Sequence, residues 1–182
     1  MDNNVRNTFC LIGDVIEKYP KSLIKDLFSE GFDFQNHTQT HSRLDGLTLN
    51  KILWEIQTAD DTITNLTQNS TAPGFIRPPS EFGVTGISIY SHLLEALQQL
   101  NKRALVWGPL SDGTNFGPVS KTPAQIKTVI NNVMNNPSWG PMGNGTISLQ
   151  HTIAVDTEAY PTILQKVKAK GLKPITVFEG IR

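Results

Sequence analysis

Apolar and polar positions follow two different periods along this 182-residue chain. Six short runs have the apolar content and length of strands, and five stretches between them place apolar residues at helical spacing. The predicted strands cover residues 7–13, 32–36, 74–83, 103–108, 145–151 and 173–178. The predicted helices cover residues 20–31, 48–66, 93–100, 121–134 and 157–170. This alternation of strand and helix predicts an α/β domain with a parallel sheet.

Start and stop signals support these helix boundaries. Thr48 and Thr122 each precede a helical stretch and can accept a hydrogen bond from its first turn. Pro123 follows Thr122 at a position where proline is favoured. Gly31 and Gly171 come after the last apolar positions of two helices and are predicted to end them.

Polar side chains stand at the carboxyl ends of the predicted strands. His37 follows the second strand, and Arg77 lies in the third. Asp112 follows the fourth strand, and His151 ends the fifth. In α/β domains, ligands bind at this edge, where loops from separate strands meet. We therefore expect these four side chains to converge on one site. No linker or repeat divides the chain, which predicts a single domain over residues 1–182.

Composition and charge exclude several classes of function. Hydrophobic residues make up 38% and charged residues 18% of the chain, as in ordinary folded domains. The 16 basic and 16 acidic residues cancel, and the lack of a Lys/Arg cluster argues against nucleic-acid binding. No apolar run reaches the roughly 20 residues that span a bilayer. A neutral polymer or small molecule is the favoured partner.

Most of the remaining cysteine, histidine and tryptophan residues are expected to have structural roles. Cys10 lies within an apolar run and is expected to be a buried structural thiol rather than a nucleophile. His92 is expected to be an exposed or hydrogen-bonded helix residue, and Trp54 and Trp107 are expected in the core. Trp139, in a loop rich in proline and glycine, is a candidate for stacking on a sugar ring.

The stretch NHTQTHS, residues 36–42, holds two of the four histidines in the chain. His37 and His41 are four residues apart, and imidazole is a common ligand of divalent metals. A pair of histidines alone can bind a cation, but it does not complete a catalytic site. The spacing therefore leaves two interpretations open, metal ligands or two neighbouring polar residues.

Three stretches of this chain, taken in sequence order, resemble motifs of the polysaccharide deacetylases, the NodB-type carbohydrate esterases that include chitin deacetylases. The stretch NTFCLIGDVIEKYPKSLIKDLFSEGFDFQNHTQTHSRL resembles the second strand and helix of that family running into its His-x-x-x-His motif. FIRPPSEFG is similar to its Arg-Pro-Pro-Tyr-Gly motif. ISLQH, followed by ILQKVKAKGLKPITV, resembles its final Leu-x-His motif and the helix and strand after it. The resemblance covers nearly the whole chain.

The resemblance implies a distorted (β/α) barrel that removes acetyl groups from N-acetylglucosamine polymers with the help of a metal. His37 and His41 would be two of three zinc ligands, and His151 would be the general acid that protonates the leaving amine. Arg77 would steady the catalytic carboxylate. Asp112, in WGPLSDGTNF, is the candidate carboxylate for orienting His151. A divalent metal polarises a carbonyl and activates water, and an imidazole is a suitable acid for an amine leaving group.

Two departures from the family pattern matter. The first motif, Thr-Phe-Asp-Asp-Gly-Pro, supplies the third metal ligand and the general base, and it does not occur in this chain. Asp60 and Asp61 are followed by Thr62 and are expected on a solvated helix face. Ser80 stands where the family has tyrosine. We therefore expect an incomplete, N-terminally truncated barrel without its first strand, which binds zinc or cobalt weakly.

The leading hypothesis is a chitin deacetylase-like hydrolase of N-acetylglucosamine polymers, with little or no activity in this chain because the Asp-Asp motif is missing. Its expected partner is chitin, a chitooligosaccharide or a related N-acetylated glycan. The first alternative is a non-catalytic carbohydrate-binding homologue, a pseudoenzyme. The second is an unrelated α/β domain with structural histidines. A secreted or cell-wall-associated protein is expected if the full-length protein carries a signal peptide.

Overall fold

The structure, a computed structural model, describes residues 5–81, 91–136, 138 and 140–180, so Trp139 lies outside the described residues. The chain forms two compact units. The sheet unit comprises residues 6–106 and 176–182, and the helix-pair unit comprises residues 1–5 and 107–175. The single domain expected over the whole chain stays a prediction.

A parallel sheet in the order β1-β2-β3-β4 forms the centre of the sheet unit. Its strands are β1 (Thr8–Leu11), β2 (Asp33–Asn36), β3 (Phe75–Ile76) and β4 (Arg103–Ala104). Each coincides with one of the first four predicted strands. Asn36, the last residue of β2, pairs with Leu11 of β1 and with Ile76 of β3. This register brings the carboxyl ends of three strands to one edge of the sheet.

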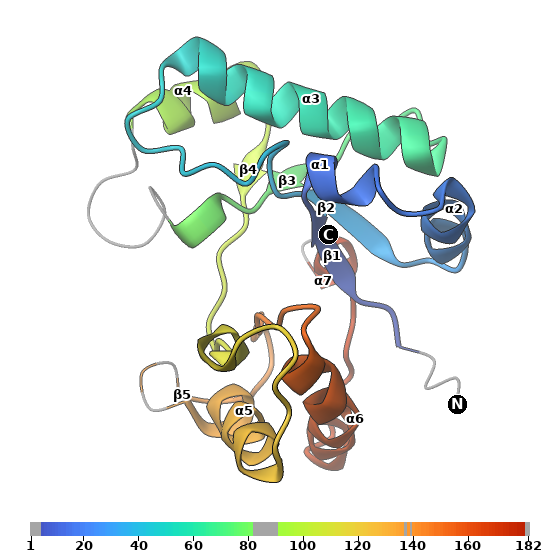
Figure 1. Ribbon diagram of the computed structural model, residues 1–182, viewed down its shortest axis with the longest axis vertical. Coiled ribbons are helices and arrows are strands. Elements are labelled where there is room, and N and C mark those ends of the chain that lie inside the picture. The colour runs from blue at the N-terminus through green and yellow to red at the C-terminus, as the bar shows by residue number, and fades with distance from the viewer. Residues whose placement is uncertain (1–4, 82–90, 137, 139, 181–182) are drawn as a thin grey trace. The chain divides into compact units, whose positions relative to one another are not determined.

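Helices and short helical turns complete the sheet unit: α1 (Gly13–Ile16), α2 (Lys21–Ser29), α3 (Leu49–Thr67), η1 (Pro79–Glu81), α4 (Ser91–Gln99) and α7 (Val177–Gly180). Figure 1 shows α3 as the longest of them, with α4 beside it. The predicted N-cap of α3 forms, because the hydroxyl of Thr48 accepts the N–H of Lys51. None of the helices in the described part of the chain combines the length and apolarity required to traverse a bilayer.

The apolar stripe of α3 organises the core of the sheet unit. Ile52 and Ile56 are fully buried and pack in a cluster with Ile76 of β3 and Leu93 of α4. Further along α3, Ile63 packs in a second cluster that contains residues of β2 and α2. Burying one isoleucine side chain contributes about 1.5–3 kcal/mol. The helical spacing of these residues in the sequence thus corresponds to the face that α3 buries.

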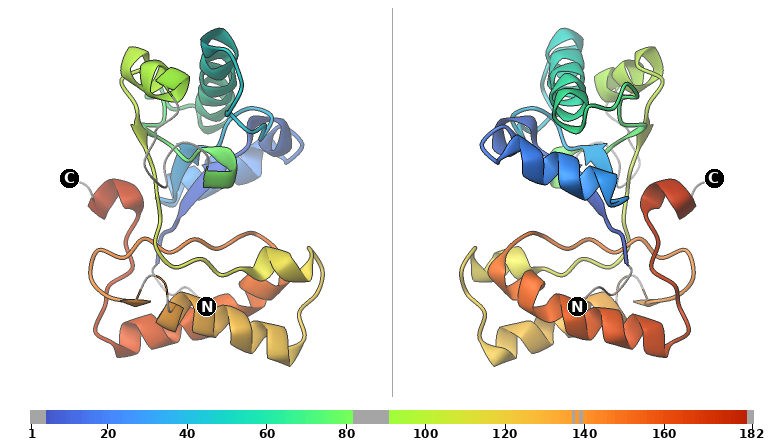
Figure 2. Two further views of the ribbon diagram at one scale, coloured as in Figure 1. Left: turned by 90° about the vertical axis from the view of Figure 1, so that its left-hand side faces the viewer. Right: turned by 90° about the vertical axis from the view of Figure 1, so that its right-hand side faces the viewer.

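The helix-pair unit consists of η2 (Gly113–Phe116), α5 (Pro123–Asn135), β5 (Gly140–Pro141) and α6 (Ala154–Ala169). Figure 2 shows α5 and α6 side by side. Between them lies a separate hydrophobic core that includes Val129 and Val133 of α5 and Val155 and Ala159 of α6. The predicted cap of α5 also forms, as a capping box between Thr122 and Gln125 with Pro123 in the first turn.

The last two predicted strands were wrong. Residues 145–151 form a single parallel bridge between Leu110 and Leu149 instead of a strand. Residues 173–178 are irregular and lead into the helical turn α7. Pro174 cannot donate a ladder hydrogen bond, and Thr176 and Glu179 cap α7 reciprocally through their side chains. The Thr-x-x-Glu signal of a helix start therefore outweighed the β-branched composition of this segment.

Candidate functional site

His37 directly follows β2, and contacts orient its ring. Its backbone N–H donates to the carbonyl of Leu11 at 2.9 Å, which continues the parallel pairing beyond the strand. Nδ1 lies 2.6 Å from the carbonyl oxygen of Arg77, so Nδ1 carries the proton and donates it. The lone pair of His37 is therefore on Nε2. Histidines that bind metals commonly donate their other N–H to a backbone carbonyl in this way.

A tight loop turns His41 back toward His37. Thr38 and His41 adopt left-handed backbone angles, with φ of 67° and 60°. The Oδ1 atom of Asn36 accepts the N–H of Thr38 at 2.7 Å, and the hydroxyl of Thr38 accepts the N–H of His41 at 3.1 Å. The Nε2 atoms of the two histidines consequently lie 3.1 Å apart. The loop thus presents two imidazole nitrogens at the same point.

Arg77 reaches the same point from β3. Its backbone N–H donates to the carbonyl of Asn36 at 2.8 Å, and its Nη1 atom lies 3.1 Å from Nε2 of His37. The structure therefore brings His37, His41 and Arg77 together within the sheet unit, at the edge expected from the order of the strands. The role of Arg77 toward a catalytic carboxylate stays a prediction.

Glu55 of α3 holds the loop between the two histidines. Its carboxylate is fully buried and accepts the N–H of Thr40 at 2.9 Å and the hydroxyl of Thr40 at 2.7 Å. Its backbone carbonyl accepts the N–H of Gln39 at 3.0 Å, and Lys51 lies 3.6 Å from the carboxylate. One residue of α3 therefore fixes two consecutive positions of the loop.

The expectation that Asp60 lies on a solvated face was wrong. Asp60 is buried, and its carboxylate accepts a hydrogen bond from the side-chain amide of Asn36 at 2.7 Å and pairs with Lys102 at 2.8 Å. Burial raises the pKa of Asp60, against the lowering effect of Lys102 and Asn36. Helical spacing in the sequence does not distinguish a carboxylate at the edge of the apolar stripe from a solvated one. The burial of Asp60 depends on its partners, Asn36 of β2 and Lys102, which are distant in sequence.

The two imidazoles fit a divalent metal in part. Two nitrogens that each lie about 2.0–2.1 Å from a tetrahedral zinc ion are about 3.3 Å apart, close to the 3.1 Å between the Nε2 atoms of His37 and His41. Across the residues that the structure describes, no group of three or more His, Cys, Asp or Glu side chains could hold a metal ion. The described residues therefore supply two ligands of a metal site and not the third.

His151 lies in the helix-pair unit, where it faces a buried carboxylate. The Nδ1 atom of His151 is 3.7 Å from Oδ2 of Asp156, the third residue of α6. The same oxygen accepts the backbone N–H of His151 at 2.6 Å and the hydroxyl of Ser111 at 2.7 Å. Burial by itself would raise the pKa of Asp156, but the contacts with His151 and Ser111 together hold it below its ordinary value.

Asp112 precedes η2 in the same unit. It has a left-handed backbone with φ of 55°, and its side chain makes no capping hydrogen bond to η2. The carboxylate at ion-pair distance from His151 in the described residues is that of Asp156. The role of Asp112 in orienting His151 stays a prediction.

A family model described as polysaccharide deacetylase matches residues 1–105, which is more than half of the chain. The chain belongs to the polysaccharide deacetylase family. This result confirms the resemblance drawn from the order of the sequence motifs.

Two relatives match this chain over most of its length. It is 27% identical over 180 residues to a peptidoglycan-N-acetylglucosamine deacetylase of Bacillus cereus, which covers 96% of the chain and 58% of the relative. It is 25% identical over 172 residues to the peptidoglycan-N-acetylmuramic acid deacetylase PdaC of Bacillus subtilis, which covers 93% of the chain and 32% of the relative. The chain thus spans little more than half of one relative and about a third of the other.

Solved structures confirm the α/β fold of the polysaccharide deacetylase type. A polysaccharide deacetylase from Bacillus cereus matches with a TM-score of 0.80 at 22% identity, over 98% of this chain and 82% of the other. A CE4 family pseudoenzyme from Bacillus anthracis matches with a TM-score of 0.79 at 19% identity, over 100% of this chain and 57% of the other. At these identities the likeness concerns the fold.

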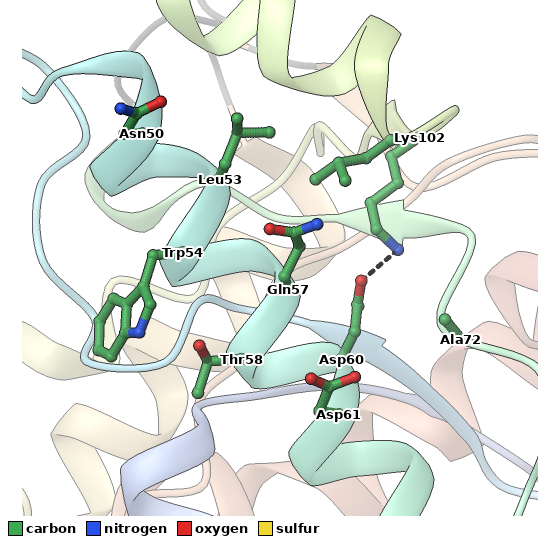
Figure 3. Close-up of a pocket in the computed structure, with 10 residues that line it drawn as sticks. Asn50, Leu53, Trp54, Gln57, Thr58, Asp60, Asp61, Ala72 and Lys102 are labelled. Atoms are coloured by element: carbon green, nitrogen blue, oxygen red, sulfur yellow. Dashed lines mark ion pairs between the residues drawn. The ribbon is translucent and has the colours of Figure 1, made fainter.

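A groove of about 780 Å³ lies beside α3 (Figure 3). Asn50, Trp54 and Gln57 line it from α3, and Figure 3 shows the ion pair of Asp60 with Lys102 within it. Trp54 was expected in the core, but its side chain is 43% exposed. Helical spacing explains this result, because Trp54 lies off the stripe that α3 buries.

Sequence reasoning missed two buried carboxylates, Glu55 beside the histidine pair in the sheet unit and Asp156 beside His151 in the helix-pair unit. Both are acidic residues inside helices, and such residues are usually solvated. Glu55 is flanked by the apolar positions Leu53 and Ile56. Asp156 is the third residue of α6, where an acidic side chain can reach back to the chain before the helix. The signal for Asp156 was therefore present in the sequence, although it did not identify His151 as the partner.

The structure agrees with the interpretation of His92 and in part with that of Cys10, which is half-buried rather than buried. Burial raises the pKa of the Cys10 thiol to about 12, which keeps it protonated and unreactive near neutral pH. The Nδ1 atom of His92 lies 3.2 Å from the carbonyl of Leu47, so this helix histidine has a hydrogen-bond partner. Neither residue adds a reactive group to the site.

Proposed function

We propose that this polysaccharide deacetylase acts on the N-acetyl groups of an N-acetylglucosamine-containing glycan, hydrolysing the acetamide to a free amine and acetate. The observation that carries this proposal is the His37–His41 pair, with Nε2 atoms 3.1 Å apart and the Nδ1 atom of His37 donating to a backbone carbonyl. The names of the two relatives favour peptidoglycan as the glycan. Chitin and chitooligosaccharides contain the same acetamido sugar and are the second substrate class proposed.

The roles proposed for the residues follow the family resemblance. His37 and His41 bind zinc or cobalt through Nε2, and a metal bound there would polarise the acetyl carbonyl. His151 donates a proton to the leaving amine, and a protonated imidazole is a suitable donor for an amine near neutral pH. Arg77 provides positive charge beside His37. Asp112 is the carboxylate that the sequence motif assigns to the orientation of His151.

We further propose that this chain turns over slowly or not at all. The sequence contains no Thr-Phe-Asp-Asp-Gly-Pro motif, and the described residues offer no third metal ligand beside the two histidines. A site with two of three ligands should bind zinc weakly, because mutation of residues that merely support metal ligands already costs about 10–100-fold in affinity.

The test combines metal titration with an assay of acetate release. The wild-type chain and the His37→Ala variant are titrated with Co²⁺ and followed by visible absorption, and acetate release is measured with chitooligosaccharides and with peptidoglycan. We expect weak Co²⁺ binding that His37→Ala abolishes, with little acetate from either glycan. His92→Gln is the matched control, because His92 lies on α4, outside the pair.

Two outcomes would contradict the proposal. Robust acetate release that His37→Ala abolishes would contradict the proposed lack of turnover while supporting the reaction. Failure of the wild-type chain to bind Co²⁺ would contradict the metal-ligand role of the two histidines, whatever the activity.

A second candidate function is non-catalytic glycan binding. The partly exposed ring of Trp54 at the groove beside α3, with the ammonium of Lys51 over one face, favours it, because an aromatic face combined with neighbouring amides such as Asn50 and Gln57 suits uncharged sugars. On this reading, Trp54→Ala should weaken binding of chitooligosaccharides at least tenfold in a calorimetric titration. Tyr19→Ala, at another exposed aromatic residue, should leave the affinity unchanged.

A further inference from the structure

The environment of His151 is built around one carboxylate from α6. Asp156 is 1% exposed, and its Oδ2 atom accepts the hydroxyl of Ser111 and the backbone N–H of His151. These two contacts fix the carboxylate 3.7 Å from Nδ1 of His151. All three residues belong to the helix-pair unit, so the cluster depends on the packing of that unit alone.

Two atoms of this cluster are buried and have no hydrogen-bond partner among the residues that the structure describes. They are Nδ1 of His151 and Oδ1 of Asp156. A buried donor and a buried acceptor left in this state each cost free energy, which a small rotation of the ring toward the carboxylate would recover. Nδ1 would then donate its proton to a hydrogen bond with Asp156, and Nε2 would carry the lone pair of the neutral ring.

The backbone around the cluster leaves space for the carboxylate. A Cβ atom on Gly113 would lie 2.0 Å from Oδ1 of Asp156, so a larger residue at this position would displace the acid. The N–H of Gly113 also donates to the hydroxyl of Ser111 at 3.3 Å. The absence of a side chain at Gly113 thus leaves the space that the carboxylate of Asp156 occupies beside Ser111.

We propose that Asp156 is the positioning residue of His151, with Ser111 holding the carboxylate in place. Asp156 fixes the tautomer with the proton on Nδ1 and orients the ring, which leaves Nε2 for exchange of a proton with the leaving amine. In serine proteases, a buried aspartate sets the tautomer of the catalytic histidine through a hydrogen bond to Nδ1–H, the bond that the proposed rotation of His151 would form. This inference rests on the proposed function, in which His151 is the proton donor, and it transfers to Asp156 the role that the sequence motif assigns to Asp112.

The experiment observes the tautomer of His151 directly by ¹⁵N NMR of the imidazole nitrogens, at a pH where the ring is neutral. The His151→Gln variant assigns the signals among the four histidines of the chain. Wild-type protein should show the proton on Nδ1. Asp156→Asn should move it to Nε2, because the amide of asparagine can donate to Nδ1. Asp112→Asn is the matched control and should leave the spectrum unchanged.

The wild-type spectrum alone can overturn the proposal. A proton mainly on Nε2 in the wild-type protein would contradict it even if Asp156→Asn fails to fold. A change of tautomer in Asp112→Asn and not in Asp156→Asn would return the role to Asp112. A different result would contradict the proposed role of His151 as proton donor. In that result the wild-type chain releases acetate, His151→Gln does not reduce the release, and the tautomer still depends on Asp156.

Discussion

At the scale of single residues, the candidate site depends on hydrogen bonds that set which nitrogen of a histidine carries the proton. The carbonyl of Arg77 takes the proton of Nδ1 in His37 and so frees Nε2 on the side of His41. In the other unit, the carboxylate of Asp156 stands opposite Nδ1 of His151. The chemistry available to each imidazole is therefore determined by a partner distant in sequence or on another element.

The depressed pKa of Asp156 predicts how stability responds to acid. Burial opposes ionisation, but the contacts with His151 and Ser111 outweigh it and keep the folded pKa below the ordinary 3.8. The unfolded chain therefore binds more protons than the folded chain between the two pKa values, and stability rises with pH through this window. The contribution is complete above about pH 4 and is lost as the pH falls through the folded pKa of Asp156.

Urea unfolding between about pH 3 and pH 6 measures this effect. The difference in free energy of unfolding between the wild-type chain and Asp156→Asn should be largest near pH 6 and should shrink toward pH 3. A difference that stays constant across this range would show that Asp156 stabilises the fold without linked protonation. Asn131→Ala on α5, at an exposed residue that does not titrate, serves as the control, and its difference from wild type should not change in this way.

At the scale of secondary-structure elements, α3 joins the core to the candidate site. Its apolar stripe packs on the sheet and on α4, while Glu55 binds the loop that carries His37 and His41. Asp60, one turn further, binds the side chain of Asn36, the last residue of β2. The site geometry therefore depends on a helix that contributes no metal ligand itself.

Replacing Glu55 tests this dependence. Glu55→Ala should lower the free energy of unfolding by about 1.5–3 kcal/mol, because it removes hydrogen bonds to a charged, buried acceptor. It should also weaken Co²⁺ binding, because Thr40 is released from its anchor, and Glu55→Gln should restore part of both losses. Urea unfolding and Co²⁺ absorption titration measure the two effects.

The matched control is Glu95→Ala on α4, at an exposed glutamate, which should change stability by less than about 0.5 kcal/mol. Equal effects of Glu55→Ala and Glu95→Ala on stability would contradict the anchoring role. Unchanged Co²⁺ affinity in a destabilised Glu55→Ala protein would restrict Glu55 to a structural contribution.

At the scale of the whole molecule, the two compact units have separate hydrophobic cores. The sheet unit holds His37, His41 and Arg77, and the helix-pair unit holds Asp112 and His151. The family match covers residues 1–105 and so does not reach the part of the helix-pair unit that begins at residue 107. The solved structures match 98–100% of the chain and so cover both units. The equal numbers of basic and acidic residues accord with chitin, the uncharged glycan of the second substrate class proposed.

Sequence reasoning succeeded where local signals and tertiary packing agree. The caps at Thr48 and Thr122 and the apolar stripe of α3 form as predicted, and the first four strands form within their predicted ranges, β3 and β4 over two residues each. It failed at residues 173–178, where the capping of α7 by Thr176 and Glu179 outweighed strand propensity. The convergence of His37 and Arg77 was predictable because parallel strands bring their carboxyl ends to one edge of the sheet.

The sequence by itself determined the family, the parallel α/β class and the histidines that carry the proposed chemistry, because periodicity and the order of motifs are properties of the chain. Only the tertiary structure decided the partners of those histidines. Glu55 and Asp156 read as ordinary helix carboxylates until packing removes them from water and places Thr40 and His151 within reach. Burial converts a soluble charge into a directional contact, and burial depends on residues far apart in the chain.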